Sequence, residues 1–141
     1  MIVVGIDGSN DERDAVKAGT LQAPGMLQAQ ASVTLPKGYR DWKLISVAQE
    51  NGRNDDIRAI LGNAIAVKAF RDGKRPFPDG AVIVRLAWRY QASPRNDAVF
   101  PAPQSFVAGA PTNVQVSVKD AKRYAATGGW GYGQFEGGRP N

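Results

Sequence analysis

The 141-residue chain contains neither cysteine nor histidine. Without cysteine it forms no disulfide and offers no thiolate, and its redox compartment cannot be read from cysteine usage. Without histidine it also lacks imidazole, so the side chains that most often bind zinc, copper or haem iron are missing. The commonest nucleophile–base pairs are missing for the same reason. The residues present therefore exclude most metal-centred and nucleophilic chemistry of the usual kind.

Long apolar runs are absent as well. No stretch approaches the roughly 18 apolar residues that span a bilayer, so no membrane partner is expected. The chain carries 18 Lys and Arg against 13 Asp and Glu, a net charge of +5. The basic residues are scattered, and their densest stretch, Lys68 to Arg75, is interrupted by Asp72. This distribution is typical of a solvated surface, with nucleic-acid binding as a weak alternative.

The N-terminal residues differ from the rest in composition. Gly19 to Ala31 is rich in Gln, Ala, Pro and Gly, as a linker is. Its last three residues, Ala29 to Ala31, have the small-x-small form of a secretory cleavage site, although residues 1–28 lack the basic start and apolar run of a leader. An ordinary linker and a processed leader both remain open. We predict residues 1–31 as an extension or linker and 32–141 as the folded domain.

Four segments of the folded domain are predicted as β-strands because apolar and polar residues alternate along them. They span residues 42–48, 81–90, 114–118 and 130–135. Residues 57–61 are too few to assign by periodicity. Residues 91–112 hold four prolines and no period, so we expect a long connection there.

Two short helices are predicted between the strands. Asn63 is a good N-cap for a helix from Ala64 to Arg71, and Asp120 for a second helix over 121–126. The spacing of strands and helices predicts an α+β domain, with an antiparallel sheet of about five strands and two or more short helices. In the last strand, Gly131 and Gly133 would let another backbone or a flat ligand approach closely.

Several segments together resemble the cytochrome P-460 family, a group of small periplasmic c-type haem proteins. Their order and spacing cover about residues 35–135. The first three matching segments are residues 35–42, the pair Gly62-Asn63 together with Ala66, Lys68 and Ala69, and residues 77–82. The fourth is residues 118–121, which runs on through Tyr124 and residues 127–132.

The resemblance implies a five-stranded antiparallel sheet, a homodimer and a periplasmic location. It further implies haem c, held by a Cys-x-x-Cys-His motif after the last strand, with hydroxylamine or nitric oxide as ligand and a possible electron-transfer partner. The chain ends at Gly137 to Asn141, where that motif would begin. We therefore expect the chain as given to be haem-free. The alternative is a non-enzymatic binding or interaction module that keeps the fold without haem.

Substitute iron ligands are few. The available side chains are Tyr39, Tyr90, Tyr124, Tyr132, Met26 and several lysines. A tyrosine ligand needs a neighbouring cation to stabilise its phenolate, and a packed ring is the more common role. The resemblance also places Ile65 where the P-460 enzymes carry a lysine cross-linked to haem. Lys68, one turn further on, is a poorer candidate, and an apolar Ile65 suits a gas-binding relative.

The remaining site candidates are cations and one aromatic residue. Arg40, Arg85 and Arg89 suit a haem propionate or a polar ligand, because both call for a fixed cation. Surface arginine is the competing interpretation of each. Lys68 and Trp130 complete the predicted cofactor-binding set, and for Trp130 a packed core position is the competing interpretation.

Overall fold

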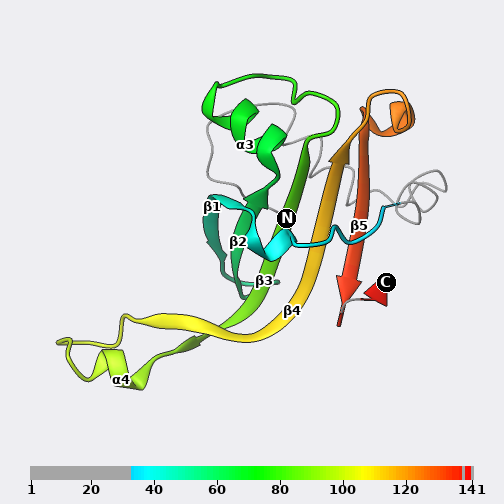
Figure 1. The fold of residues 1–141 in the computed structure, drawn as a ribbon. Helices are drawn as coiled ribbons and strands as arrows, with labels where there is room; N and C mark the ends of the chain where they lie inside the picture. The colour runs from blue at the N-terminus through cyan, green and yellow to red at the C-terminus, as the bar shows by residue number, and fades with distance from the viewer. Residues whose placement is uncertain (1–32, 138, 141) are drawn as a thin grey trace.

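The computed structural model describes residues 33–137 and 139–140, which form one antiparallel sheet with helices at its ends (Figure 1). The strand order is β1-β2-β3-β4-β5-β6, so each strand pairs with its neighbour in sequence. The strands are β1 Lys43–Glu50, β2 Asp56–Gly62, β3 Val82–Ala92, β4 Phe106–Lys119, β5 Trp130–Glu136 and the two-residue β6 Arg139–Pro140. The predicted α+β class with five main strands is confirmed. The predicted linker lies outside the described residues.

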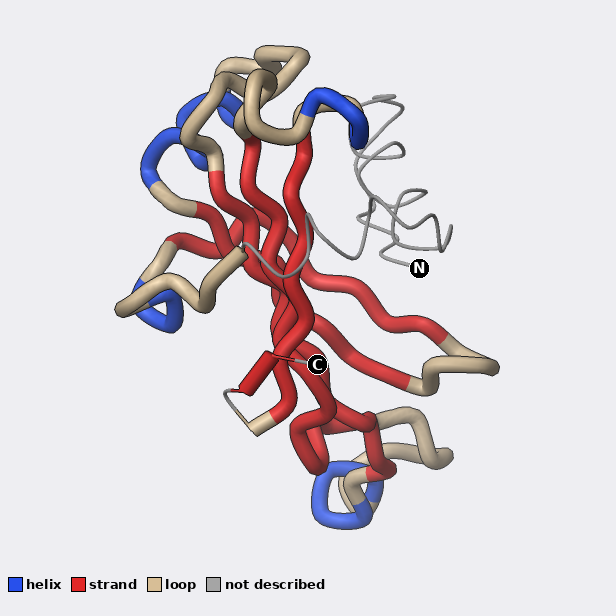
Figure 2. The backbone as a smooth tube through the Cα atoms, turned by 90° about the vertical axis from the view of Figure 1, so that its right-hand side faces the viewer, coloured by secondary structure: helices blue, strands red, loops and turns tan. Residues whose placement is uncertain are grey.

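The helices are short; most lie near the strand ends, and the one that precedes β1 lies against a face of the sheet (Figures 1 and 2). They are the 3-10 turns η2 Tyr39–Asp41 and η3 Ala125–Thr127, and the α-helices α3 Ala64–Arg71 and α4 Pro94–Asp97. The helix predicted over Ala64 to Arg71 is confirmed at both ends. Its cap is also confirmed, because the Asn63 side chain accepts a hydrogen bond from the backbone N–H of Ala66.

One face of the sheet carries the larger apolar cluster. Its buried members are Val33, Leu61, Val84, Leu86, Val116, Tyr124 and Phe135. The segment from Val33 to Trp42 crosses this face in front of β5, β4 and β3 before it enters β1 (Figure 1). Leu35, Tyr39 and Trp42 from that segment pack against the cluster. We call this side of the sheet the apolar face.

The opposite side, which we call the helix face, receives α3. A second cluster forms there from Ala66, Ala69, Phe77, Ala81, Trp130 and Tyr132. Small residues on α3 allow the helix to approach β1, β2 and β3 closely. Around the middle of β3, Val84 is buried in the first cluster, and on the other side of the strand Arg85 is buried in an ion pair with Asp56.

Two sequence predictions need correction. Residues 91–112 are not one long connection: β3 continues to Ala92 and β4 begins at Phe106. Prolines suggested a loop, yet Pro111 is accommodated where the β3–β4 register shifts, as proline is tolerated at bulges. Residues 121–126 form turns and the 3-10 helix η3 rather than an α-helix.

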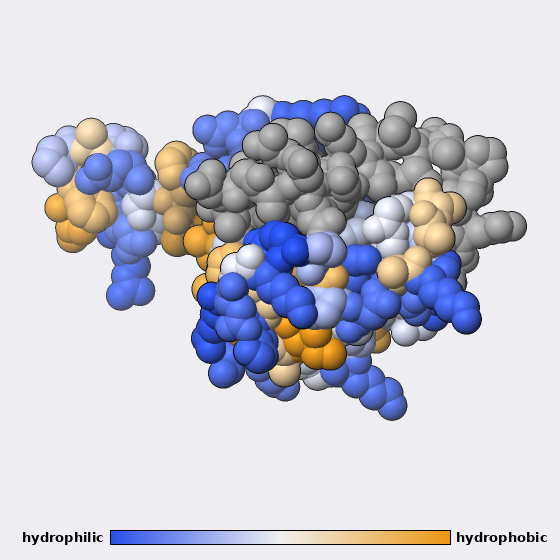
Figure 3. Space-filling view, turned by 90° about the horizontal axis from the view of Figure 1, so that it is seen from above, coloured by the Kyte–Doolittle hydropathy of each residue, from blue (hydrophilic) through white to orange (hydrophobic). Residues whose placement is uncertain are grey.

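The paired ends of β3 and β4 project away from the body as an arm (Figures 1 and 3). The Tyr90 and Phe106 rings meet edge to face across the arm, with centroids 5.3 Å apart. Val99, Phe100 and Phe106 are exposed there. Elsewhere the visible surface in Figure 3 is largely hydrophilic, in keeping with the scattered charges of the sequence.

Candidate functional site

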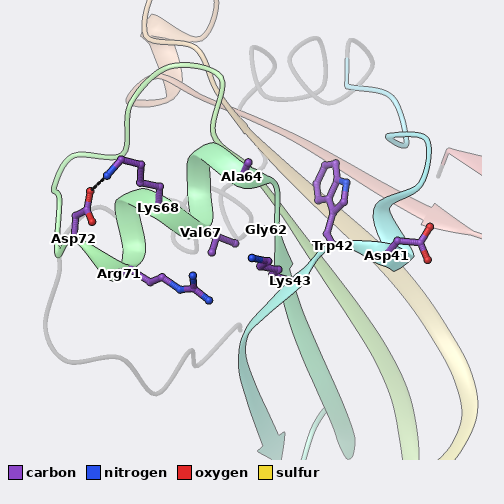
Figure 4. Close-up of a pocket in the computed structure, with 9 residues that line it drawn as sticks. All are labelled: Asp41, Trp42, Lys43, Gly62, Ala64, Val67, Lys68, Arg71 and Asp72. Atoms are coloured by element: carbon purple, nitrogen blue, oxygen red, sulfur yellow. Dashed lines mark hydrogen bonds and ion pairs between the residues drawn. The ribbon is translucent and has the colours of Figure 1, made fainter.

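The largest hollow that we describe lies between the start of β1 and α3 (Figure 4). We call it the Trp42 cavity. Its volume is about 490 Å³, and its lining residues are Asp41, Trp42, Lys43, Gly62, Ala64, Val67, Lys68, Arg71 and Asp72. The η2 turn brings Asp41 and Trp42 to one wall, and α3 forms the other.

The shape of the Trp42 cavity follows from small residues opposite a large one. The half-buried Trp42 indole stands beside Gly62 and Ala64 (Figure 4). At Gly62 a Cβ would lie 2.6 Å from Cδ1 of Ile45 and 3.1 Å from Cβ of Ala66, so a larger residue there would force the Ile45 side chain to shift. The flat indole on one wall, with Ala64 and Val67 on the wall formed by α3, offers a face on which a planar group could stack.

Three cations and two carboxylates surround the cavity. Lys68 is paired with Asp72 at 2.5 Å in an exposed i,i+4 ion pair. Among the described residues, Lys43 and Arg71 form no ion pair, and their side chains reach toward each other from β1 and α3 (Figure 4). Asp41, on the wall opposite α3, forms no ion pair with a described residue either, so the unmatched groups leave an excess of one positive charge, which favours an anionic group between Lys43 and Arg71.

A second hollow, of about 250 Å³, lies on the apolar face. Its lining includes Tyr39, Arg40, Trp88, Pro111 and Phe135. The Arg40 guanidinium lies 5.3 Å from the centre of the Tyr39 ring. Arg40 is thus a rim cation of this hollow and does not reach the Trp42 cavity.

A third hollow, of about 290 Å³ and polar in lining, holds the other two predicted arginines. Arg85 is buried, donating to Asp56 at 2.5 Å and to Asn113 at 2.8 Å. Burial first, and then the charge of Arg58, hold the pKa of Arg85 below its ordinary value, while Asp56 raises it. Arg89 is exposed and donates to the Asn54 carbonyl at 3.2 Å.

The predicted site residues are therefore not brought together in one place. Lys68 belongs to the Trp42 cavity, Arg40 to the hollow on the apolar face, and Arg85 and Arg89 to the polar hollow. Trp130 is 1% exposed and lines none of the three. Its ring meets Phe77 edge to face at 6.0 Å, which makes it a core residue.

The tyrosines considered as iron ligands are engaged elsewhere. Tyr124 and Tyr132 are buried in the two apolar clusters, and Tyr39 packs against the first of them. Tyr90 donates to Asp55 at 3.3 Å. Met26 lies outside the described residues.

The described residues also lack a carboxylate cluster for a metal. Within 33–137 and 139–140 no group of three or more Asp or Glu residues is close enough to hold an ion. The whole chain has no histidine or cysteine. The described residues thus supply a cavity with an indole wall and cations at its rim, while the sequence contains no imidazole or thiolate for haem iron.

Sequence reasoning missed Lys43 and Arg71. Part of the signal was present, because Ala64, Val67, Lys68 and Arg71 follow the i, i+3, i+4, i+7 spacing of one helix stripe. The sequence did not predict which residues face that stripe, because the other wall of the Trp42 cavity comes from residues 41–43, about twenty positions earlier in the chain.

Comparison with known proteins gives one family. A family model described as Cytochrome P460 matches residues 36–141. No curated protein matches the chain. Within the described part of the chain, every helix is too short or too polar to cross a membrane.

Proposed function

The chain belongs to the cytochrome P460 family, and from this premise we propose that it forms the pocket-bearing part of a haem domain for small nitrogen-containing ligands. The observation that carries the proposal is the Trp42 cavity. It combines a flat aromatic wall, small residues opposite that wall, and two unmatched cations at the rim. A planar group with peripheral carboxylates matches all three features.

The residues present fit the periphery of a haem and not its iron. Trp42 offers a face for the ring system, and Lys43 and Arg71 offer charge partners for propionates. Covalent attachment takes cysteine sulfur and the family's proximal bond takes imidazole, and residues 1–141 contain neither. Thioether bonds and a proximal ligand would have to come from outside these residues.

When bound, the haem would supply a redox-active iron for ligands such as nitric oxide or hydroxylamine. The side chains of α3 favour the first of these. Lys68 is engaged by Asp72, and the apolar residues that α3 contributes to the cavity are Ala64 and Val67, whereas Ile65 is 44% exposed and does not line it. An apolar wall suits a diatomic gas better than the polar hydroxylamine. We propose a gas-binding role within the family.

The test uses a haem c peptide that carries its own Cys-x-x-Cys-His segment and so supplies the groups that this chain lacks. The purified chain alone should be colourless. Titrating it into the peptide should shift and sharpen the Soret band in a saturable way. Trp42→Ala should weaken this binding about tenfold, since stacking and apolar contact are lost, and Lys43→Gln should weaken it about fivefold.

Trp88→Ala is the matched control, because Trp88 lines the hollow on the apolar face and not the Trp42 cavity. It should leave the affinity for the haem peptide unchanged. Equal losses in both tryptophan variants would refute the Trp42 cavity as the haem site. A folded chain that binds neither the peptide nor free haemin would instead support a binding or interaction module without haem.

The family also leads us to propose a periplasmic setting, a homodimer and an electron-transfer partner. The exposed apolar residues Val99, Phe100 and Phe106 on the projecting arm support association with a second copy. Sedimentation equilibrium of the purified chain tests this part directly. A monomer at all concentrations would refute the dimer and leave the haem proposal unaffected.

A further inference from the structure

One edge of the sheet is the strand β1 (Figure 1). Its ladder partner is β2, and among the described residues no backbone hydrogen bond joins β1 to another segment. In an antiparallel ladder, every second residue of an edge strand directs its N–H and C=O groups away from the neighbouring strand. The opposite edge differs, because β6 pairs with the end of β5. β1 therefore presents a row of backbone donors and acceptors on which a further strand can form a ladder.

The side chains of β1 make this edge apolar along its middle. Lys43 and Glu50 are charged at the two ends, and the residues between them include no charge and no proline. Val47 is 65% exposed and Leu44 is 56% exposed. Edge strands are commonly protected from pairing by a charged residue or a proline, and the middle of β1 has neither. An edge of this composition is suited to pairing with another strand.

A register shift at Ile45 puts Leu44 and Val47 on the same side of the sheet. Leu44 is paired with Leu61. Val47 is paired with Ala59, and the β1–β2 register shifts by one residue between these two pairs. Leu61 and Ala59 are two residues apart on β2, so they face the same way, and Leu61 belongs to the cluster on the apolar face. Leu44 and Val47 thus extend the apolar face to the edge of the sheet.

The same shift makes the order of charges along β1 symmetric about Val47. The ladder partners of Lys43, Val47 and Glu50 are, in that order, Gly62, Ala59 and Asp56. These partners are evenly spaced along β2, so Lys43 and Glu50 lie the same number of ladder positions before and after Val47. Two copies of β1 that run antiparallel and meet at Val47 therefore place Lys43 of each copy opposite Glu50 of the partner subunit.

The charges at the ends of β1 favour this antiparallel order. Lys43 forms no ion pair with a described residue. The Glu50 side chain is 22% exposed beside its partner Arg58, so its carboxylate remains in reach of a second cation. Opposite charges facing each other across a ladder are stabilising, whereas a parallel order would set like charges opposite each other.

We infer that a second copy of this chain pairs antiparallel with β1, across a two-fold axis at Val47, so that the two sheets become one. The contact presupposes the dimer proposed above and assigns it to β1 rather than to the arm. The new ladder pairs the outward backbone groups of β1, and Val47 gains Val47 of the partner subunit as its neighbour. One strand pair is a small interface, so we expect a Kd on the order of 10 µM.

The first test uses single cysteines, since the chain has none of its own. Opposed residues of an antiparallel ladder have Cα atoms about 4.5–5.5 Å apart, within the span of a disulfide. Gln49→Cys, on the same face of β1, is the register control, because the two-fold axis would hold its two Cα atoms about 14 Å apart. Under mild oxidation, non-reducing electrophoresis should show Val47→Cys forming linked dimers about tenfold faster than Gln49→Cys, because only its thiols are held together.

The second test follows association by sedimentation equilibrium. Val47→Lys sets like charges against each other at the axis and should make the chain monomeric. The Val47 side chain is exposed, so the fold should be kept, and far-UV circular dichroism checks this. Val99→Lys, the same substitution at an exposed valine of the arm, is the matched control and should dimerise as the parent chain does.

The results that overturn the contact at β1 are distinct from those that refute the dimer or the haem site. Dissociation by Val99→Lys and not by Val47→Lys would put the second copy on the arm, so the contact would be wrong and the dimer would stand. Equal cross-linking of Val47→Cys and Gln49→Cys would exclude the axis at Val47. A parent chain that stays monomeric would refute both contact and dimer, while the haem peptide titration needs only one chain and would be unaffected.

Discussion

The ring of Tyr124 lies directly against the backbone of Gly131. A Cβ placed on Gly131 would come within 3.0 Å of three atoms of that ring. Gly133, two residues on, is approached in the same way by Val33, 3.1 Å from such a Cβ. From the sequence we expected another backbone or a flat ligand to lie close to the glycines of β5. In the structure, the side chains of Tyr124 and Val33 occupy that space.

Gly131→Ala should destabilise the fold by about 1–3 kcal/mol, because the added methyl group overpacks the contact with Tyr124. Urea unfolding followed by circular dichroism measures the change. The same substitution in a Tyr124→Ala background should cost much less, since the space is then open. Equal costs in the two backgrounds would show that the strain has another origin.

Asn63→Ala should cost about 2 kcal/mol of unfolding free energy. The Asn63 side-chain oxygen accepts from the backbone N–H groups of Ala66 at 2.9 Å and Val82 at 3.2 Å, and its amide donates to the Gly80 carbonyl at 2.8 Å. The side chain thus caps α3 and ties it to β3.

Asp120→Ala provides the comparison for Asn63→Ala. Asp120 caps the turn before η3, where its carboxylate accepts a hydrogen bond from the Arg123 N–H at 2.9 Å, so its loss should cost about 1 kcal/mol. Thermal or urea unfolding of both variants shows which substitution lowers the free energy of unfolding more. A larger loss for Asp120→Ala would contradict the role assigned to Asn63.

The contrast between these residues shows what the sequence could reveal. The cap at Asn63 and the helix after it were predictable because the signal is local. The start of β4 at Phe106 was missed because proline content outweighed periodicity, while the pairing partner in β3 was unknown. The ion pair between Asp56 and Arg85 was invisible for a similar reason: it joins two strands 29 residues apart.

Trp130→Ala should cost about 3–5 kcal/mol, as for other large buried residues. The predicted burial of Trp130 is confirmed, because its exposed fraction is 1%. Removing the indole would leave an empty space beside Phe77, whose ring it contacts. Trp130→Phe should recover part of the loss, because a ring is kept against Phe77. Denaturant unfolding of the two variants provides the measurement, and a neutral Trp130→Ala would contradict core packing.

The Tyr90 phenol should titrate above its ordinary pKa. Desolvation raises the pKa first, and the charge and hydrogen bond of Asp55 raise it further. A raised folded-state pKa means that the associated stability is present below the ordinary phenol value of about 10 and is lost as pH rises through the folded pKa. Phenolate absorbance of the chain minus that of Tyr90→Phe isolates this residue. Asp55→Asn should lower the pKa of Tyr90, and an unchanged titration would remove Asp55 as a cause.

Asp56→Asn should be among the most damaging conservative substitutions, with a cost of about 3–5 kcal/mol. Asp56 is 3% exposed and its carboxylate joins Arg58 to Arg85, so its removal leaves two buried guanidinium groups without their shared partner. Replacing Arg85 by Gln in the Asp56→Asn chain removes one of those charges. The double variant should therefore be less destabilised than the sum of the single variants, which urea unfolding of all four chains would show. Strict additivity would mean that the two residues contribute separately, and the ion pair would not be what holds β2 and β3 together at this point.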